Sequence, residues 1–120
     1  MPESEVVFYR EDATVLFDQW LDRLPVKVQA KCLTYLRLLR SQGHELRRPI
    51  ADYLRDGIYE LRPAYQSVNY RILYFFSGRN IVVISHGISK ESEVPAVEIN
   101  RVMERKKEYE ANPKAHGWRG

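Results

Sequence analysis

The spacing of apolar residues along this 120-residue chain changes from the period of an α-helix to the period of a β-strand. Between residues 13 and 39 apolar side chains recur every three or four positions, which indicates helices with one buried side. Between residues 67 and 87 the segment SVNYRILYFFSGRNIVVISHG alternates on either side of a short turn, which predicts two antiparallel strands. Helical and strand periods in separate blocks predict an α+β domain.

The first block predicts two helices that form a hairpin. The first helix has Glu11 and Asp12 in its first turn, where negative charge is favourable, and its apolar stripe is Ala13, Leu16, Phe17, Trp20, Leu21 and Leu24. Pro25 fits the first position of the second helix, where its missing N–H is not needed. The apolar stripe of this second helix is Val28, Cys32, Tyr35, Leu36 and Leu39.

Four strands are expected, at the segments SEVVFYR, GIYELRP, SVNYRILYFF and IVVISH, and the last three form a meander. Residues 43–57 are expected to be a loop, and a further helix is expected from Pro95 to about Tyr109. The predicted order is therefore β-α-α-β-β-β-α in one domain, residues 1–120, with residues 111–120 as a flexible tail. We expect a small antiparallel sheet with one face under helices and the other face open.

Composition excludes several classes of protein. No stretch approaches the roughly 18 consecutive apolar residues of a membrane span, so we expect a soluble cytoplasmic protein. The single cysteine, Cys32, is expected to be a buried apolar residue. Neither the spacing of a metal site nor a glycine loop for phosphate binding is present, and no cofactor is predicted.

Charge is unevenly distributed along the chain, whose formal net charge is +3. Residues 1–22 carry one basic and six acidic side chains, whereas residues 23–79 carry eleven basic and four acidic ones. A positive middle segment suggests a polyanionic partner such as RNA or DNA. The alternative is a solvated surface with no electrostatic role.

Two arginines are candidates for binding such a polyanion. Strand alternation places Arg71 on the side opposite the apolar set Val68, Tyr70, Ile72, Tyr74 and Phe76. Arg62 can lie beside Arg71 if their strands pair in suitable register, and two adjacent guanidinium groups repel unless an anion lies between them. That anion is either a phosphodiester or an internal carboxylate such as that of Glu60.

His86 is a candidate for proton transfer because its ordinary pKa lies near neutral pH, although a hydrogen-bonded core imidazole is the alternative. RNA can be cleaved without a metal ion, because its 2′-hydroxyl attacks the adjacent phosphate once a base removes the proton and cations stabilise the developing charge.

The ordered segments YELR, YRILYFF, IVVISHGISKESEVP and EINRVMERKKEYEANPKAH resemble the RelE/ParE toxin superfamily, particularly its phage-derived, HigB-like branch. The resemblance implies a small α+β toxin of a type II toxin–antitoxin module. Many members cut mRNA in the ribosome without a metal cofactor. It also implies an antitoxin partner, expected to be a helix-turn-helix protein encoded next to this chain.

The resemblance also implies roles for individual residues. Arg62 and Arg71 match phosphate-contacting positions. His86 and Lys90, in the segment HGISK, match positions for proton transfer or stabilisation of the transition state. Tyr74 matches the second aromatic of the YRxxY pattern, but its alternation with Ile72 favours core packing. In this interpretation, replacing Arg71 with alanine abolishes growth inhibition and leaves the fold intact.

The sequence departs from the family pattern at two positions. Glu60 stands where many RelE-type enzymes have a basic residue, and Pro95 lies near the position of a catalytic tyrosine in some members. Two further functions therefore stay open: a ParE-like inhibitor of DNA gyrase without nuclease chemistry, and an inactive homologue that retains only antitoxin binding.

Overall fold

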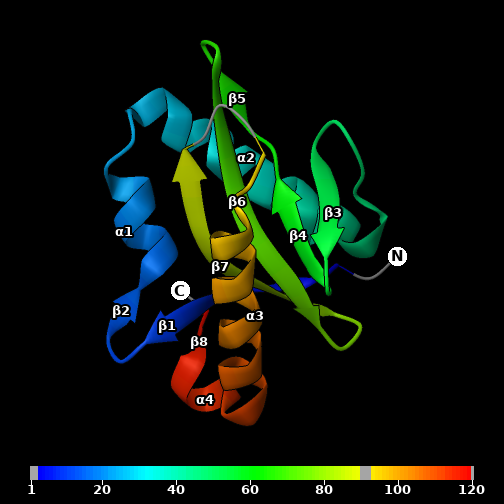
Figure 1. Cartoon of the computed structure of the whole chain (residues 1–120). Coiled ribbons are helices and arrows are strands. Elements are labelled where there is room, and N and C mark those ends of the chain that lie inside the picture. Colours follow the sequence, from blue (N-terminus) through cyan, green and yellow to red (C-terminus); the bar gives the residue numbers. More distant parts are fainter. Residues whose placement is uncertain (1–2, 90–92, 120) are drawn as a thin grey trace.

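The computed structural model describes residues 3–89 and 93–119. Its described residues form four α-helices and one sheet of eight strands in the order β2-β1-β7-β6-β4-β3, with β5 paired to β6 and β8 to β1 (Figure 1). The strands are β1 (Glu5–Glu11), β2 (Thr14–Val15), β3 (Ala51–Arg55), β4 (Ile58–Leu61), β5 (Ala64–Tyr65), β6 (Val68–Ser77), β7 (Ile81–Ser89) and β8 (Gly117–Trp118). The helices are α1 (Leu16–Asp22), α2 (Val26–Gln42), α3 (Ala96–Ala111) and α4 (Pro113–His116), and Gly43–Glu45 form a short 3-10 turn.

The sheet contains both parallel and antiparallel strand pairs. The prediction of an entirely antiparallel sheet is therefore wrong for one pair of strands. Strand β1 runs parallel to β7, with Val6 opposite Val82 and Phe8 opposite Ile84. The strand pairs β3–β4, β4–β6 and β6–β7 are antiparallel, as a meander requires. A parallel neighbour is possible for β1 because two helices and most of the sheet separate it from β7 in the chain.

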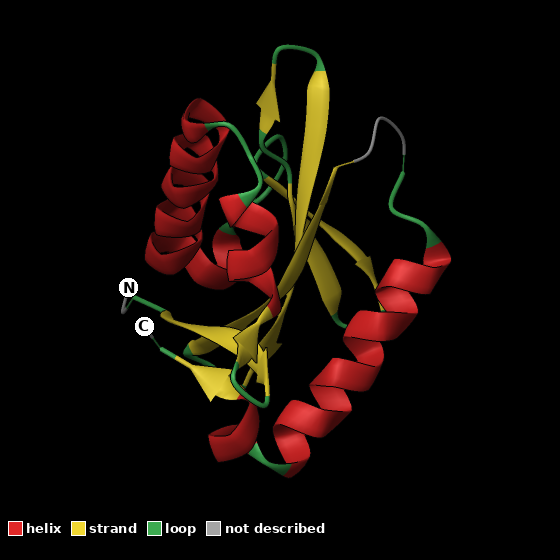
Figure 2. Cartoon of the chain, turned by 90° about the vertical axis from the view of Figure 1, so that its left-hand side faces the viewer, coloured by secondary structure: helices red, strands yellow, loops and turns green. Residues whose placement is uncertain are grey.

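Helices cover both faces of the sheet, whereas one open face was expected. Helices α1 and α2 lie on one side of the sheet and α3 on the other (Figure 2). The alternation of β6 explains this, because both of its sides are apolar: Tyr70, Ile72 and Tyr74 pack towards α1 and α2. Leu73 and Phe75 pack against a second core that includes Ile99, Val102 and Tyr109 of α3.

The two predicted helices of the first block are present, but the first is shorter than expected. Asp12 adopts a left-handed backbone conformation with φ 51°, and residues 10 and 11 pair with residues 15 and 14 in a tight hairpin. Glu11 and Asp12 therefore lie before α1 rather than in its first turn. Helix α2 begins at Val26, one residue later than predicted, with Pro25 at its N-cap, and it buries Val28, Cys32, Leu36 and Leu39. Burial raises the pKa of the Cys32 thiol to about 11, which makes it unreactive.

Two other segments have more regular structure than the sequence indicated. The expected loop at residues 43–57 contains β3, which forms the edge of the sheet beside β4. The expected tail contains α4 and β8, and β8 pairs with β1 through Trp118 opposite Phe8. His116 supports this attachment, since its Nδ1–H donates to the carbonyl of Arg10 at 2.9 Å.

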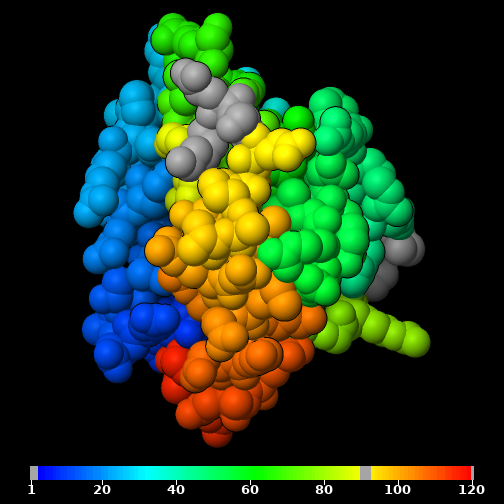
Figure 3. All heavy atoms as spheres, in the orientation of Figure 1, coloured from blue at the N-terminus to red at the C-terminus, as the bar shows by residue number. Residues whose placement is uncertain are grey.

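The first turns of α3 lie beside β3 and β4, at one edge of the sheet. In the space-filling view, residues of β3 and β4 (green) border the first half of α3 (yellow to orange) (Figure 3). No helix within residues 3–89 or 93–119 is long and apolar enough to cross a membrane. The side of the sheet under α3 carries the polar side chains that concern function.

Candidate functional site

Arg62 and Arg71 lie together on the α3 side of the sheet, which is covered by that helix and is not the open face that the sequence suggested. Glu60 in β4 lies opposite Leu73 in β6, and Arg71 precedes Leu73 by two residues. Arg62 follows directly after β4, held by the hydrogen bond from its backbone N–H to the carbonyl of Ile50. Strand pairing therefore brings three charged side chains from two strands to one place.

The anion between the two guanidinium groups is the carboxylate of Glu60. Arg62 Nη1 donates to Glu60 Oε2 at 2.7 Å, and Arg71 Nε lies 3.0 Å from Glu60 Oε1. The side chain of Glu60 is 5% exposed and that of Arg71 8% exposed, whereas that of Arg62 is 24% exposed. This is the internal pairing that the sequence left open as the alternative to a bound phosphodiester.

One carboxylate leaves the pair of arginines incompletely neutralised. Burial lowers the pKa of Arg71, the charge of Glu60 raises it again, and Arg62 and Arg48 lower it further. Glu60 Oε1 is buried and accepts no well-aligned hydrogen bond, although Arg71 Nε is near. The ion pair with Arg71 therefore compensates this buried oxygen by charge rather than by an aligned hydrogen bond.

Further charged side chains lie around Glu60, Arg62 and Arg71. Asp52 of β3 lies opposite Glu60 and accepts from Arg48 Nε at 2.9 Å. Burial alone would raise the pKa of Asp52, but the hydrogen bonds and charge of Arg48 lower it. Arg55 Nη2 donates to Asn100 Oδ1 of α3 at 2.8 Å, which ties β3 to the helix.

These side chains line an open cavity of about 490 Å³, which we call the arginine pocket. Its walls come from β3, β4, β6 and the start of α3. The charged residues that line it are Arg48, Arg55, Arg62, Arg71, Asp52, Glu60 and Glu93. Four guanidinium groups against three carboxylates give this pocket a positive balance, which favours an anionic ligand.

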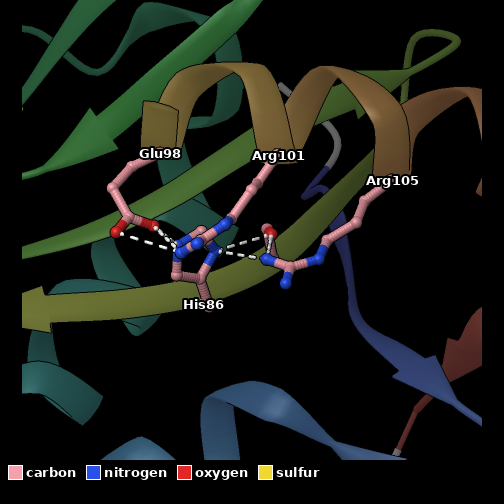
Figure 4. Close-up of polar contacts among 5 residues, drawn as sticks. His86, Glu98, Arg101 and Arg105 are labelled. Carbon is pink, nitrogen blue, oxygen red and sulfur yellow. Dashed lines mark hydrogen bonds and ion pairs between the residues drawn. The ribbon is translucent and has the colours of Figure 1, made fainter. Parts of the chain in front are cut away.

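His86 lies outside the lining of the arginine pocket, in a separate polar cluster between β7 and α3. The histidine cluster consists of Ser85, His86, Glu98, Arg101 and Arg105, and Figure 4 labels the last four. His86 Nε2 lies 2.9 Å from Glu98 Oε1, and His86 Nδ1 lies 2.8 Å from Arg105 Nη1. Both ring nitrogens of His86 are therefore engaged inside the protein.

The contacts of His86 define its tautomer. A guanidinium group can only donate, so Nδ1 accepts from Arg105 and carries no proton. The proton is therefore on Nε2, which donates to Glu98, and the ring is neutral. Burial lowers the pKa of His86, Glu98 raises it, and the charges of Arg105 and Arg101 lower it.

Ser85 and His86 both face α3 because β7 contains a bulge. Leu73 pairs with His86 and Tyr74 pairs with Ile84, so Ser85 is the extra residue. The hydroxyl oxygen of Ser85 lies 2.9 Å from His86 Nδ1 and accepts from Arg105 at 3.1 Å. Ser85, His86 and Glu98 are arranged like a hydrolase triad, but Ser85 is fully buried and holds the imidazole rather than attacking a substrate.

Reasoning from the sequence did not identify the partners of His86. Glu98, Arg101 and Arg105 recur at i, i+3 and i+7 in α3, which is the spacing of a second, polar stripe beside the buried residues Ile99 and Val102. This spacing was visible in the sequence, but nothing local indicated that the stripe meets His86.

The other predicted site residues have different outcomes. Lys90 lies outside the described residues. Tyr74 is 1% exposed and packs in the core, as its alternation predicted. Within the described part of the chain, no group of three His, Cys, Asp or Glu side chains is arranged to hold a metal ion.

Comparison with known families identifies a family that covers most of the chain. The model of a family described as phage-derived protein Gp49-like (DUF891) matches residues 19–107, about three-quarters of the chain. The matched range includes Arg62, Arg71, His86 and the polar stripe of α3. No curated protein matches the chain.

Proposed function

Because this chain belongs to the phage-derived Gp49-like family, which is toxin-like, we propose that it is the toxin of a type II toxin–antitoxin module. Its proposed activity is metal-independent cleavage of mRNA at the ribosome, in the manner of RelE- and HigB-type toxins. The proposed partners are the ribosome, mRNA and an antitoxin, which we expect to be a helix-turn-helix protein encoded next to it. The proposed place of action is the cytoplasm.

The observation that supports this proposal is the convergence of Arg62 and Arg71 in the arginine pocket. Two guanidinium groups at one point provide bidentate donors for the scissile phosphate and stabilise the charge that develops on it. In the proposal His86 transfers a proton and Lys90 assists with charge. The products are a 2′,3′-cyclic phosphate or 3′-phosphate end and a 5′-hydroxyl end.

A second candidate function follows from Glu60. The carboxylate of Glu60 already pairs with both arginines, and such pairing suits a toxin fold that binds its partners without cleaving RNA. The alternatives are therefore a gyrase inhibitor and an inactive homologue that binds only an antitoxin.

The test is induction of the chain in cells followed by mapping of transcript 5′ ends. The nuclease proposal expects new 5′-hydroxyl ends at codon boundaries, and it expects them to disappear in Arg62→Ala. Lys107→Ala is the control, since Lys107 is a 72% exposed cation of α3 outside the arginine pocket. An SOS response with intact mRNA would favour the gyrase inhibitor, and toxicity in neither assay would leave the binding-only homologue.

A further inference from the structure

Four aromatic rings lie in a row on the face of the sheet that α1 and α2 cover, beside the 3-10 turn that follows α2. The ring of Tyr53 in β3 meets that of Tyr59 in β4, with 5.0 Å between ring centroids. Tyr59 meets Phe76 of β6 at 5.2 Å, and Phe76 stacks on His44 of the turn at 3.6 Å. Because β3, β4 and β6 are neighbouring strands (Figure 1), these rings form one continuous surface, which we call the aromatic row.

The two ends of the aromatic row are exposed, whereas its middle is partly buried. Tyr53 is 52% exposed, and His44 is exposed as well. Tyr59 and Phe76 pack against the core under α1 and α2 and support the two outer rings. The hydroxyl of Tyr53 accepts from the backbone N–H of Gly57 at 3.0 Å, which fixes this ring. Exposed rings that are already held in place stack on a flat partner at little cost in side-chain entropy.

A cation lies beside the aromatic row. Burial raises the pKa of Tyr74, and the charge of Arg47 opposes that rise, so Arg47 is close to the rings that Tyr74 contacts. Arg47 is exposed, and its Nη1 donates to the carbonyls of His44 and Leu46 at 2.6 and 3.3 Å. Within residues 3–89 and 93–119 it forms no ion pair with a carboxylate. Aromatic rings that stack on bases, next to a guanidinium group that contacts phosphate, are the chemistry that binds single-stranded nucleic acid.

Strand β3 connects the aromatic row to the arginine pocket. In the described part of the chain no strand lies beyond β3, so a bound chain can pass around this edge. Successive side chains of β3 point to opposite faces: Asp52 accepts from Arg48 in the arginine pocket, and the ring of Tyr53 meets Tyr59. Tyr53 itself lines the arginine pocket as well. The two surfaces are therefore continuous across a single strand.

We propose that the aromatic row and Arg47 form a second contact surface for single-stranded RNA, with bases stacked on Tyr53 and His44 and a phosphate at Arg47. This inference rests on the part of the proposed function that names RNA as the ligand, and not on cleavage. Stacking accepts every base, so the surface adds affinity without sequence preference. Duplex RNA is expected to bind weakly there, because its bases are already stacked and paired.

The test measures binding of a fluorescent single-stranded RNA 12-mer to the purified full chain at one salt concentration. Tyr53→Leu keeps an apolar side chain but removes the ring, and it is expected to weaken binding about 5- to 150-fold, the usual effect of losing one stacked base. Tyr53→Phe keeps the ring and is expected to keep the affinity. Trp118→Leu is the matched control, since Trp118 is a 41% exposed aromatic residue of β8, far from β3 in the strand order.

A second variant and two readouts separate this surface from the arginine pocket. His44→Ala is expected to lose affinity as Tyr53→Leu does, and it carries the test if Tyr53→Leu has a lowered melting temperature. Wild-type affinity in both variants, with binding still weakened in Arg62→Gln, would overturn the second surface alone. An equal loss in Tyr53→Phe and Tyr53→Leu would also contradict it, because stacking needs only the ring. A wild-type chain that binds no RNA would overturn the RNA ligand and this inference together, whereas binding without cleavage would overturn the proposed cleavage alone.

Discussion

Arg62 and Arg71 share one carboxylate but have different surroundings. The guanidinium group of Arg71 lies in the sheet under α3, and only 8% of its side chain is exposed. Arg62 pairs with the same carboxylate from the rim of the pocket. The sequence indicated two equivalent phosphate ligands, but burial makes one of them a structural residue as well.

We expect this difference to appear in stability. Arg71→Ala leaves a buried carboxylate with one partner fewer and is expected to lower the free energy of unfolding by about 3–5 kcal/mol. Arg62→Ala removes a partly solvated partner and is expected to cost about 1 kcal/mol. Urea unfolding of both variants measures the difference. Equal losses of unfolding free energy in the two variants would contradict the difference in burial between Arg62 and Arg71. A large loss in Arg71→Ala would contradict the expectation from the sequence that this variant keeps its fold intact.

His86 makes stability depend on pH. Burial and the charges of Arg105 and Arg101 lower its pKa below the ordinary value of 6.5, against the opposing effect of Glu98. Between the folded and unfolded pKa values the unfolded chain therefore binds more protons. The contribution of His86 to stability is then present above about pH 6.5 and is lost as the pH falls through the folded pKa.

Thermal unfolding between pH 8 and pH 5 measures this effect. Between pH 8 and pH 5 the melting temperature of the wild-type chain is expected to fall further than that of His86→Gln, because glutamine does not titrate. Against the effect of burial, the hydrogen bond and charge of His86 lower the pKa of Glu98, so the comparison reports the coupled titration of His86 and Glu98. Parallel curves would show that His86 is not held neutral by the histidine cluster.

Among the helices and strands, β7 shows how one extra residue changes which face of the sheet each later side chain occupies. Strict alternation would put Ile84 and His86 on the same face. The bulge at Ser85 instead sends Ile84 into the core under α1 and α2, and His86 towards α3. The next residue, Gly87, lies against α1, where a Cβ atom would overlap the indole ring of Trp20.

The contact between α1 and β7 is therefore expected to require glycine at position 87. Gly87→Ala is expected to lower the free energy of unfolding by about 1–3 kcal/mol, which is the usual cost of overpacking. Combining it with Trp20→Leu makes room for the methyl group, so the double variant is expected to be more stable than the sum of the two single losses predicts. Ser89→Ala, at the exposed end of β7, is the control. Additive losses would contradict the proposed overlap.

The whole molecule is a sheet between two helical layers (Figure 2), and the arginine pocket lies at its β3–β4 edge beside α3. The sequence predicted a positive middle segment and an open sheet face for a polyanion. The structure keeps the positive segment but reduces the open face to the arginine pocket, because α3 covers the rest with apolar contacts.

A polyanion bound at this edge is expected to dissociate as salt increases. Binding of an RNA 12-mer to the wild-type chain is expected to give a straight line when the logarithm of affinity is plotted against the logarithm of salt concentration. Arg62→Gln is expected to reduce the slope by about 0.7, the contribution of one phosphate contact on a single strand. Lys107→Gln is expected to keep the wild-type slope. An unchanged slope in Arg62→Gln would place the polyanion elsewhere.

The sequence could predict those parts of the fold that depend on near neighbours. The apolar stripe of α2, the helix after Pro95 and the hairpin of β6 and β7 follow from spacings of two to four residues, and the structure confirms them. It could not predict β3, whose segment ADYLR has charges in place of a clean period and becomes a strand by pairing with β4. It could not predict β8 either, which is a strand because β1 offers it a free edge.

For the candidate site, the amino-acid sequence alone determined which residues bear charge and which side of its own strand Arg71 occupies. Only the tertiary structure decided what each residue meets: Glu60 between Arg62 and Arg71, and α3 against His86. The physical reason is that charge and alternation are local properties of the chain. A partner is chosen by strand register, by the bulge at Ser85 and by the packing of α3, all of which join residues that are distant in sequence.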